Sequence, residues 1–360
     1  MTHRIQVGML FIIMHLSFSY LIYPDLIYRL TKTSHWEVIL CQGLMQLILL
    51  WIYYKGLNYF PDKNVIEIYL KIGKWAAIIF LTPYVINLIA IVGFNLRLHA
   101  EVINDVFLPR TPYWSILILL FFISVYTAIK GLDTILRSSV IIFFIVIPLI
   151  FFNIFSSFTN FDLHSVSPVW DSPLKFLFNI KYFYLMGFSS FLILGFISSG
   201  ANSNFCQIFA VFVSVVLFSL SAVYIPLFIF GQETVTTLAY PFLEAINSVD
   251  ISWFIFNRQT MVFGISLVGL VILANAVLLW MSGHIMQKTY KWKTMEAAYW
   301  IILLSVIAFV VALVVPHQSL VEKFFLWSTG AQTYFMIIIP SFIFLYGSLS
   351  KGGLVGYDKK

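Results

Sequence analysis

The sequence predicts an all-α polytopic membrane protein with about ten transmembrane helices, and three observations predict it. Of the 360 residues, 61% are hydrophobic and 10% are charged, whereas soluble domains have roughly 25% charged residues. The apolar residues form long unbroken runs, unlike the short alternating segments of a β-barrel. Many of these runs approach the roughly 20 residues that a helix needs to cross a bilayer. A soluble globular domain, a disordered chain and a coiled coil are therefore excluded.

The apolar runs place the spans in order along the chain, with prolines near several of their ends. The expected spans are residues 5–23, 36–57, 75–96, 113–130, 138–157, 176–198, 205–230, 260–282, 297–315 and 324–348. We expect a single transmembrane permease-like domain over residues 1–360, because no loop is long enough for a separate domain. Most of the 21 lysines and arginines fall on the side that holds the N-terminus. Both termini are therefore predicted to be cytoplasmic.

The remaining polar residues exclude several classes of function. The net charge of +6 comes from basic residues scattered between apolar runs, so no nucleic-acid-binding face is expected. Cys41 and Cys206 form no metal-ligand or disulfide pattern. Because the sequence also lacks a nucleophile motif or paired carboxylates within a span, we expect neither an enzyme nor a cofactor or metal.

A polar cluster interrupts the first span, where burying an unpartnered polar group is costly. His15, Ser17 and Ser19 alternate here with Leu16, Phe18 and Tyr20. The segment is interpreted either as an unwound stretch whose N–H groups bind an anionic ligand group, or as serines bonded back to their own helix with His15 facing a neighbouring helix. On the first interpretation, the ligand-binding residues are His15, Ser17, Phe18, Ser19 and Tyr20.

The sixth span has a matching interruption. Gly187, Phe188, Ser189 and Ser190 lie halfway along it, and a second small-residue cluster follows at residues 198–200. A glycine beside a serine pair is a plausible break point, and close packing of small residues is the alternative. Interruptions at corresponding places in two five-helix halves indicate a transporter site. We therefore expect the four residues to bind ligand, within a few ångströms of His15 and residues 17–20.

Two further sets of polar residues lie in or near spans 3 and 8. Arg97 and Glu101 are four residues apart and could pair on one helical face, as a gate, an ion relay, a partner contact or a solvated helix end. Asn87, in span 3, is assigned to the ligand site. Asn275, in span 8, is also assigned to it, although packing through an interhelical hydrogen bond is an alternative.

The order and spacing of several motifs resemble one family. They are Asn-Leu-Arg-Leu-His-Ala-Glu at 95–101, Phe-Leu-Pro-Arg-Thr-Pro at 107–112, Tyr-Thr-Ala-Ile-Lys-Gly-Leu at 126–132 with Arg137, and Tyr-Pro-Phe at 240–242 with Arg258. Over nearly its whole length, the chain resembles the B subunit of the nutrient germinant receptors of endospores. These spore germination permeases are a branch of the amino acid–polyamine–organocation transporters.

The resemblance implies two inverted five-helix repeats with broken helices 1 and 6 and a pocket for a small nutrient, usually an amino acid, between the breaks. It also implies an A subunit and a lipoprotein C subunit as partners, and a place in the cell membrane or the inner spore membrane. Ligand binding would then signal to the partners to start germination.

The chain departs from the family pattern at the expected site. Helix 6 commonly has Gly-x-Glu, where this chain has Gly187, Phe188 and Ser189, and Thr260 stands where helix 8 commonly has Glu. An acidic partner for a ligand ammonium group is therefore missing. Three functions stay open: a nutrient-sensing receptor subunit, an ion-coupled amino-acid transporter with His15 or Glu101 as the titratable group, and a scaffold without ligand.

Overall fold

The protein is described here by a computed structural model that covers residues 3–61, 63–170, 174–197, 205–249, 259–290 and 295–355. Within these residues the chain is helical and forms no strand. The α-helices are α1 (His3–Ser19), α2 (Tyr23–Leu30), α3 (His35–Asn58), α4 (Val65–Ile72), α5 (Lys74–Val106), α6 (Tyr113–Ile129), α7 (Leu132–Ser157), α8 (Ile180–Met186), α9 (Phe205–Val235), α10 (Pro241–Asn247), α11 (Gln259–Tyr290), α12 (Ala297–Val314) and α13 (Gln318–Val355). Short 3-10 helices are η1 (Phe158–Asn160), η2 (Leu163–Val166), η3 (Leu174–Phe178) and η4 (Phe191–Gly195). Residues 198–200 and Arg258, which the sequence pattern singled out, lie outside the described part of the chain.

The prediction of about ten spans with broken helices 1 and 6 is confirmed. In the described part of the chain, seven helices are long and apolar enough to cross a membrane, and the pair α1 and α2, bent by 58°, forms an eighth span. The 17-residue helix α6 and the short pair α8 and η4 account for spans 4 and 6. We call α1 with α2 helix 1, and α8 with η4 helix 6.

One predicted boundary is wrong by about ten residues. The third span was expected to end at residue 96, but α5 continues to Val106. The helix does not end in solvent at residue 96, since Asn95, Arg97 and His99 are at most 4% exposed and Arg97 pairs with Glu101. A solvated helix end is therefore not the correct interpretation of Arg97, whereas Asp105 in the last turn is exposed.

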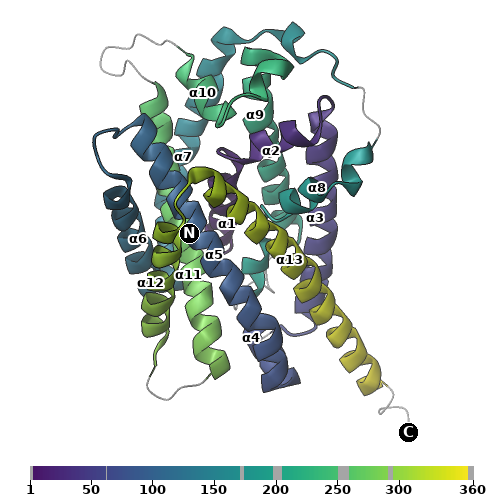
Figure 1. Ribbon diagram of the computed structural model, residues 1–360. Helices are drawn as coiled ribbons and strands as arrows, with labels where there is room; N and C mark the ends of the chain where they lie inside the picture. Colours follow the sequence, from purple (N-terminus) through teal and green to yellow (C-terminus); the bar gives the residue numbers. More distant parts are fainter. Residues whose placement is uncertain are drawn as a thin grey trace.

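The bundle has a central group of helices and an outer layer (Figure 1). The apolar stretch of α11 is 78% buried and that of α5 is 61% buried, against 28% for the span containing α7 and 33% for α12. Helix α11 packs against α5, α7, α12 and α1, while α13 packs against α3 and α5. Helix α1 packs on α11, the most buried of these helices, and on α7 and α9.

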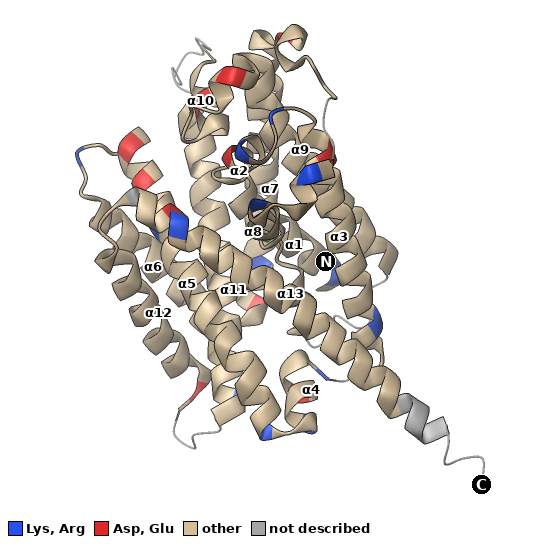
Figure 2. Cartoon of the chain, turned by 45° about the vertical axis from the view of Figure 1, so that its right-hand side comes forward, with Lys and Arg blue, Asp and Glu red and all other residues tan. Residues whose placement is uncertain are grey.

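Charged residues lie mostly toward the two ends of the bundle (Figure 2), as a bilayer-spanning protein requires. At one end, α4 begins with a capping box in which Asn64 and Glu67 bond to each other's backbone N–H groups. The Lys288 ammonium group, at the end of α11, lies 2.7 Å from Glu67. The hydrogen bond from Lys288 is the main reason that the pKa of Glu67 is lowered. The loop helix α4 is thereby attached to the central helix α11.

Candidate functional site

Helix 1 is interrupted at residues 20–22, which we call the helix 1 break. The last serine of α1, Ser19, donates from its hydroxyl to the carbonyl oxygen of His15 at 2.8 Å, so it bonds back to its own helix. Tyr20 leaves the helix and its ring packs 4.5 Å from Phe242 and 6.1 Å from Phe263, measured between centroids. The break therefore begins three residues later than Ser17, and Ser17 and Phe18 are still helical.

Helix 6 is interrupted at residues 187–190, which we call the helix 6 break, where the sequence predicts it. Helix α8 ends at Met186, and η4 begins only at Phe191. At Gly187 a Cβ atom would overlap the backbone carbonyl of Thr329 in α13. A glycine is required here because the backbone of the break lies directly against another helix.

His15, one turn before the helix 1 break, binds α1 to the helix 6 break. Its Nδ1 lies 2.8 Å from the carbonyl oxygen of Phe11, which can only accept, so Nδ1 carries the proton and Nε2 is an acceptor. The backbone N–H of Ser190 donates to Nε2 at 3.2 Å, and the Ser189 hydroxyl lies 3.0 Å from the same atom. The prediction that His15 lies within a few ångströms of Ser189 and Ser190 is confirmed. The same proximity for residues 17–20 stays a prediction. A role of either segment in binding ligand remains a prediction.

The carbonyl groups at the end of α8 have side-chain partners from two other helices. The amide groups of Gln42 and Gln46, one turn apart on α3, donate to the carbonyls of Leu185 and Met186, each at 3.0 Å. The hydroxyl of Thr333 on α13 donates to the carbonyl of Phe183 at 2.8 Å. The glutamine bonds add to the turn bonds that the carbonyls of Leu185 and Met186 accept from the backbone N–H groups of Phe188 and Ser189. They hold the helix 6 break in place in a region where water is scarce.

The sequence analysis missed Gln42 and Gln46. Two glutamines spaced i, i+4 inside an apolar span are a detectable pattern, since both must find partners on one face of the helix. Nothing in the sequence shows that these partners are the carbonyls of helix 6.

Aromatic side chains fill the space between the two breaks. The ring of Phe325, from α13, lies 6.2 Å from that of Phe18 beside the helix 1 break and 5.8 Å from that of Phe188 in the helix 6 break. Tyr23, at the start of α2, packs edge-on against Phe188 at 5.8 Å. All four side chains are buried. A ligand between the breaks would therefore have to displace part of this aromatic cluster.

A small cavity with a mostly apolar lining and three polar residues lies beside this cluster. It has a volume of about 10 Å³ and is lined by Ser17, Phe18, Leu21, Ile22, Asn95, Leu98, His99 and Phe325. Among the described residues, Ser17 Oγ, Asn95 Nδ2 and His99 Nε2 are buried without a hydrogen-bond partner. Asn95 and His99 stand one turn apart on α5 and so share a face. The three unpartnered groups therefore come from two helices and line one cavity.

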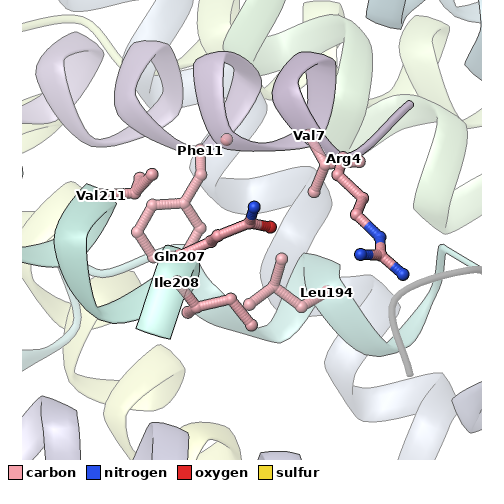
Figure 3. Close-up of a pocket in the computed structure, with 8 residues that line it drawn as sticks. Arg4, Val7, Phe11, Leu194, Gln207, Ile208 and Val211 are labelled. Carbon is pink, nitrogen blue, oxygen red and sulfur yellow. The ribbon is translucent and has the colours of Figure 1, made fainter. Parts of the chain in front are cut away.

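A second pocket lies at the other end of α1 (Figure 3). Its volume is about 40 Å³, and the polar residues Arg4 and Gln207 line it together with apolar side chains of α1, η4 and α9. Phe11 forms part of its wall and packs on His15, with ring centroids 4.3 Å apart. Phe11 thus stands between this pocket and the His15 contact with the helix 6 break.

The other expected ligand residues make different contacts. Asn87 donates to the amide oxygen of Gln332 on α13 at 3.1 Å. Asn275 donates to the carbonyl of Val271 in its own helix at 2.7 Å. Neither contact joins a break, so their assignment to the site stays a prediction.

The Arg97–Glu101 pair is buried at the end of α5. The Arg97 guanidinium group donates to Glu101 and to the carbonyl of Ala312 on α12 at 3.4 Å, and it stacks over the Tyr113 ring at 3.8 Å. It thereby links α5 to α6 and α12. A role as a gate or ion relay stays a prediction.

In the part of the chain that the structure describes, the helical bundle with broken helices 1 and 6 has the fold of solved membrane-protein structures. One similar solved structure is Mhp1, a nucleobase-cation-symport-1 family transporter, in a closed conformation with bromovinylhydantoin bound. It has a TM-score of 0.63 and 13% identity over 89% of this chain and 74% of that chain. Another is MhsT in complex with L-phenylalanine, with a TM-score of 0.61 and 12% identity over 96% of this chain and 98% of that chain. At these identities the likeness shows the fold alone.

The chain belongs to the spore germination protein family (Spore_permease), whose sequence profile matches residues 3–320. It is 24% identical over 233 residues to the spore germination protein YfkT of Bacillus subtilis (strain 168), covering 64% of each chain. It is also 24% identical over 228 residues to the spore germination protein YndE of the same organism, covering 62% of each chain. The matches thus span somewhat less than two thirds of the length of these relatives. The chain is a permease-like membrane protein of the spore germination family.

Proposed function

We propose that this chain binds a small nutrient, in the first place an amino acid, between the helix 1 and helix 6 breaks, and signals to partner subunits to start germination. The observation that carries the proposal is the contact of His15, in α1 just before the helix 1 break, with Ser189 and Ser190 in the helix 6 break. Backbone breaks inside a membrane protein persist where they line a binding site or a cavity. The bound L-phenylalanine of MhsT, a protein of the same fold, supports a small amino acid as the ligand class.

The signal would arise from the aromatic cluster. Phe18, Phe188 and Phe325 pack together across the breaks, so a ligand that enters must move at least one of them. A ligand shifts a conformational equilibrium by its differential affinity for the two states. The proposed outcome is a change in how helices 1, 6 and α13 pack, which the germinant-receptor A subunit and the lipoprotein C subunit would detect. On this proposal the chain lies in the inner spore membrane with both termini in the cytoplasm.

The test is the nutrient response of spores that lack this chain, followed as loss of optical density over a panel of amino acids, sugars and nucleosides. The proposal expects a selective loss of the response to one nutrient. Spores carrying Ser189→Trp should lose the same response although the protein still inserts, because the indole would occupy the space between the breaks. Ser214→Trp is the matched control, since Ser214 bonds to its own helix on α9. An unchanged response in the deletion strain would refute the receptor proposal.

A second candidate function is ion-coupled amino-acid transport. The similarity to two transporter structures over 89% and 96% of the chain favours it. Uptake of labelled amino acids into vesicles that contain the purified chain separates the two functions. A transporter would accumulate the label when an ion gradient is imposed, whereas a receptor subunit would bind without accumulation.

A further inference from the structure

Two histidines near the breaks have the same tautomer but different surroundings. His15 and His99 each place Nδ1 2.8 Å from the carbonyl oxygen four residues earlier in the helix, so both have the proton on Nδ1 and a lone pair on Nε2. Nε2 of His15 is occupied by the helix 6 break. Nε2 of His99, which is 2% exposed, has no partner among the described residues. His99 is therefore the histidine whose acceptor is available to a ligand.

The unpartnered groups around His99 define a hydrogen-bonding pattern. His99 Nε2 accepts, Asn95 Nδ2 donates, and the Ser17 hydroxyl does either. These residues are 2%, 2% and 1% exposed, respectively. A buried donor or acceptor without a partner is costly, so the three groups together favour an occupant that satisfies all of them. No Lys, Arg, Asp or Glu lines this cavity.

The three unpartnered groups can all be satisfied by some polar groups of a nutrient but not by others. An ammonium group only donates, and so it leaves the Asn95 N–H unpaired. A carboxylate oxygen only accepts, and so it leaves Nε2 of His99 unpaired. A hydroxyl group donates one hydrogen bond, to His99, and accepts from Asn95 and Ser17. The cavity volume of about 10 Å³ also matches one oxygen atom, since a water-sized group needs roughly 10–15 Å³.

We propose that Ser17, Asn95 and His99 form a subsite for the hydroxyl group of a hydroxylated nutrient, and that this subsite selects such a nutrient over its deoxy analogue. The inference rests on the proposed function, because the cavity borders Phe18 and Phe325 of the aromatic cluster that a ligand between the breaks would move. A water molecule offers the same chemistry, so the experiment has to distinguish a ligand hydroxyl from a resident water.

The experiment uses the full chain in lipid nanodiscs and matched pairs of probes that differ by one hydroxyl group. The pairs are L-serine and L-alanine, L-threonine and L-2-aminobutyrate, and inosine and 2′-deoxyinosine. We expect one hydroxylated probe to bind at least about tenfold more tightly than its deoxy partner, the ratio that follows from leaving one buried polar group unpaired. His99→Phe should abolish the difference in affinity between the two members of the pair.

Two further variants distinguish the loss of the hydrogen-bond acceptor from a general effect of the substitution on folding. His99→Gln places an amide oxygen close to the position of Nε2 and should restore part of the preference. His284→Phe is the matched control, because His284 has the same bond from Nδ1 to the carbonyl four residues earlier. His284 lies near the C-terminal end of α11 and does not line this cavity. It should leave the preference unchanged.

The outcomes separate the two proposals. If a probe binds but both members of its pair bind equally, or if the preference survives in His99→Phe, the subsite holds water alone and the inference is overturned. If none of the probes binds and spores lacking the chain respond normally to every nutrient, the proposed function fails and the inference with it.

Discussion

Replacing His15 tests the hydrogen bonds that connect α1 to the helix 6 break. His15→Phe keeps an aromatic ring of similar size in contact with Phe11 but removes the acceptor of the Ser190 N–H. His15 and Ser190 are 3% and 9% exposed, so water does not readily replace the lost partner. A buried N–H without a partner costs about 1–3 kcal/mol. Single polar contacts between membrane helices average about 0.6 kcal/mol, because the unfolded chain in the membrane also finds partners. We therefore expect His15→Phe to lower the free energy of unfolding by about 1 kcal/mol, the low end of the range for a buried unpaired group.

Two further variants measure separately the contacts of His15 Nε2 with the Ser190 N–H and with the Ser189 hydroxyl. His15→Gln keeps an acceptor near the position of Nε2 and should retain most of the stability. Ser189→Ala removes only the hydroxyl contact at 3.0 Å and should cost less than about 1 kcal/mol. The assay is equilibrium unfolding of the purified chain in mixed micelles with increasing mole fraction of sodium dodecyl sulfate. If His15→Phe is as stable as the wild type, or His15→Gln as unstable as His15→Phe, the Ser190 hydrogen bond does not stabilise the break.

Three further predictions concern other parts of the structure. Gly187→Ala should disrupt the packing of helix 6 on α13, because the added methyl group would overlap the carbonyl of Thr329; we expect a loss of at least about 3 kcal/mol, visible as a lower unfolding midpoint in the same micelles. Gln46→Leu should leave the carbonyl that it binds without this partner and cost about 1 kcal/mol, measurable as faster hydrogen exchange at the helix 6 break. Glu67→Gln should remove a small stabilisation that depends on pH: the hydrogen bond from Lys288 lowers the pKa of Glu67 in the folded protein, so the stabilisation is present at neutral pH and is lost as the pH falls below about 4. An equal difference in stability between this variant and the wild type at pH 3 and pH 7 would contradict that assignment.

The sequence predicted the helix breaks well because their cause is local. Glycine and paired serines in the middle of an apolar span weaken the helix whatever surrounds it, and the break at Gly187 lies where this pattern places it. The helix 1 break was expected from Ser17 onward but begins at Tyr20, since Ser19 bonds to the carbonyl of His15 and keeps the helix intact through this turn.

Residues that act through distant partners were not predictable in the same way. Asn95 and His99 stand in the motif at residues 95–101, but only the tertiary packing of the helices brings Ser17 to the same cavity. The carbonyls that Gln42 and Gln46 bind are 143 and 140 residues away in the chain. A polar residue inside a membrane must find a partner, but the sequence does not name the partner.

The sequence by itself determined the membrane class, the approximate spans and the two interruptions, because these follow from composition and from the local conformational preferences of each segment. The tertiary structure decided which interruption meets which side chain: His15 reaches Ser189 across 174 residues of sequence. It also decided which buried polar groups have hydrogen-bond partners and which line a cavity without one. Hydrogen bonding inside a bundle depends on how helices distant in the sequence pack, and that packing is a property of the whole fold.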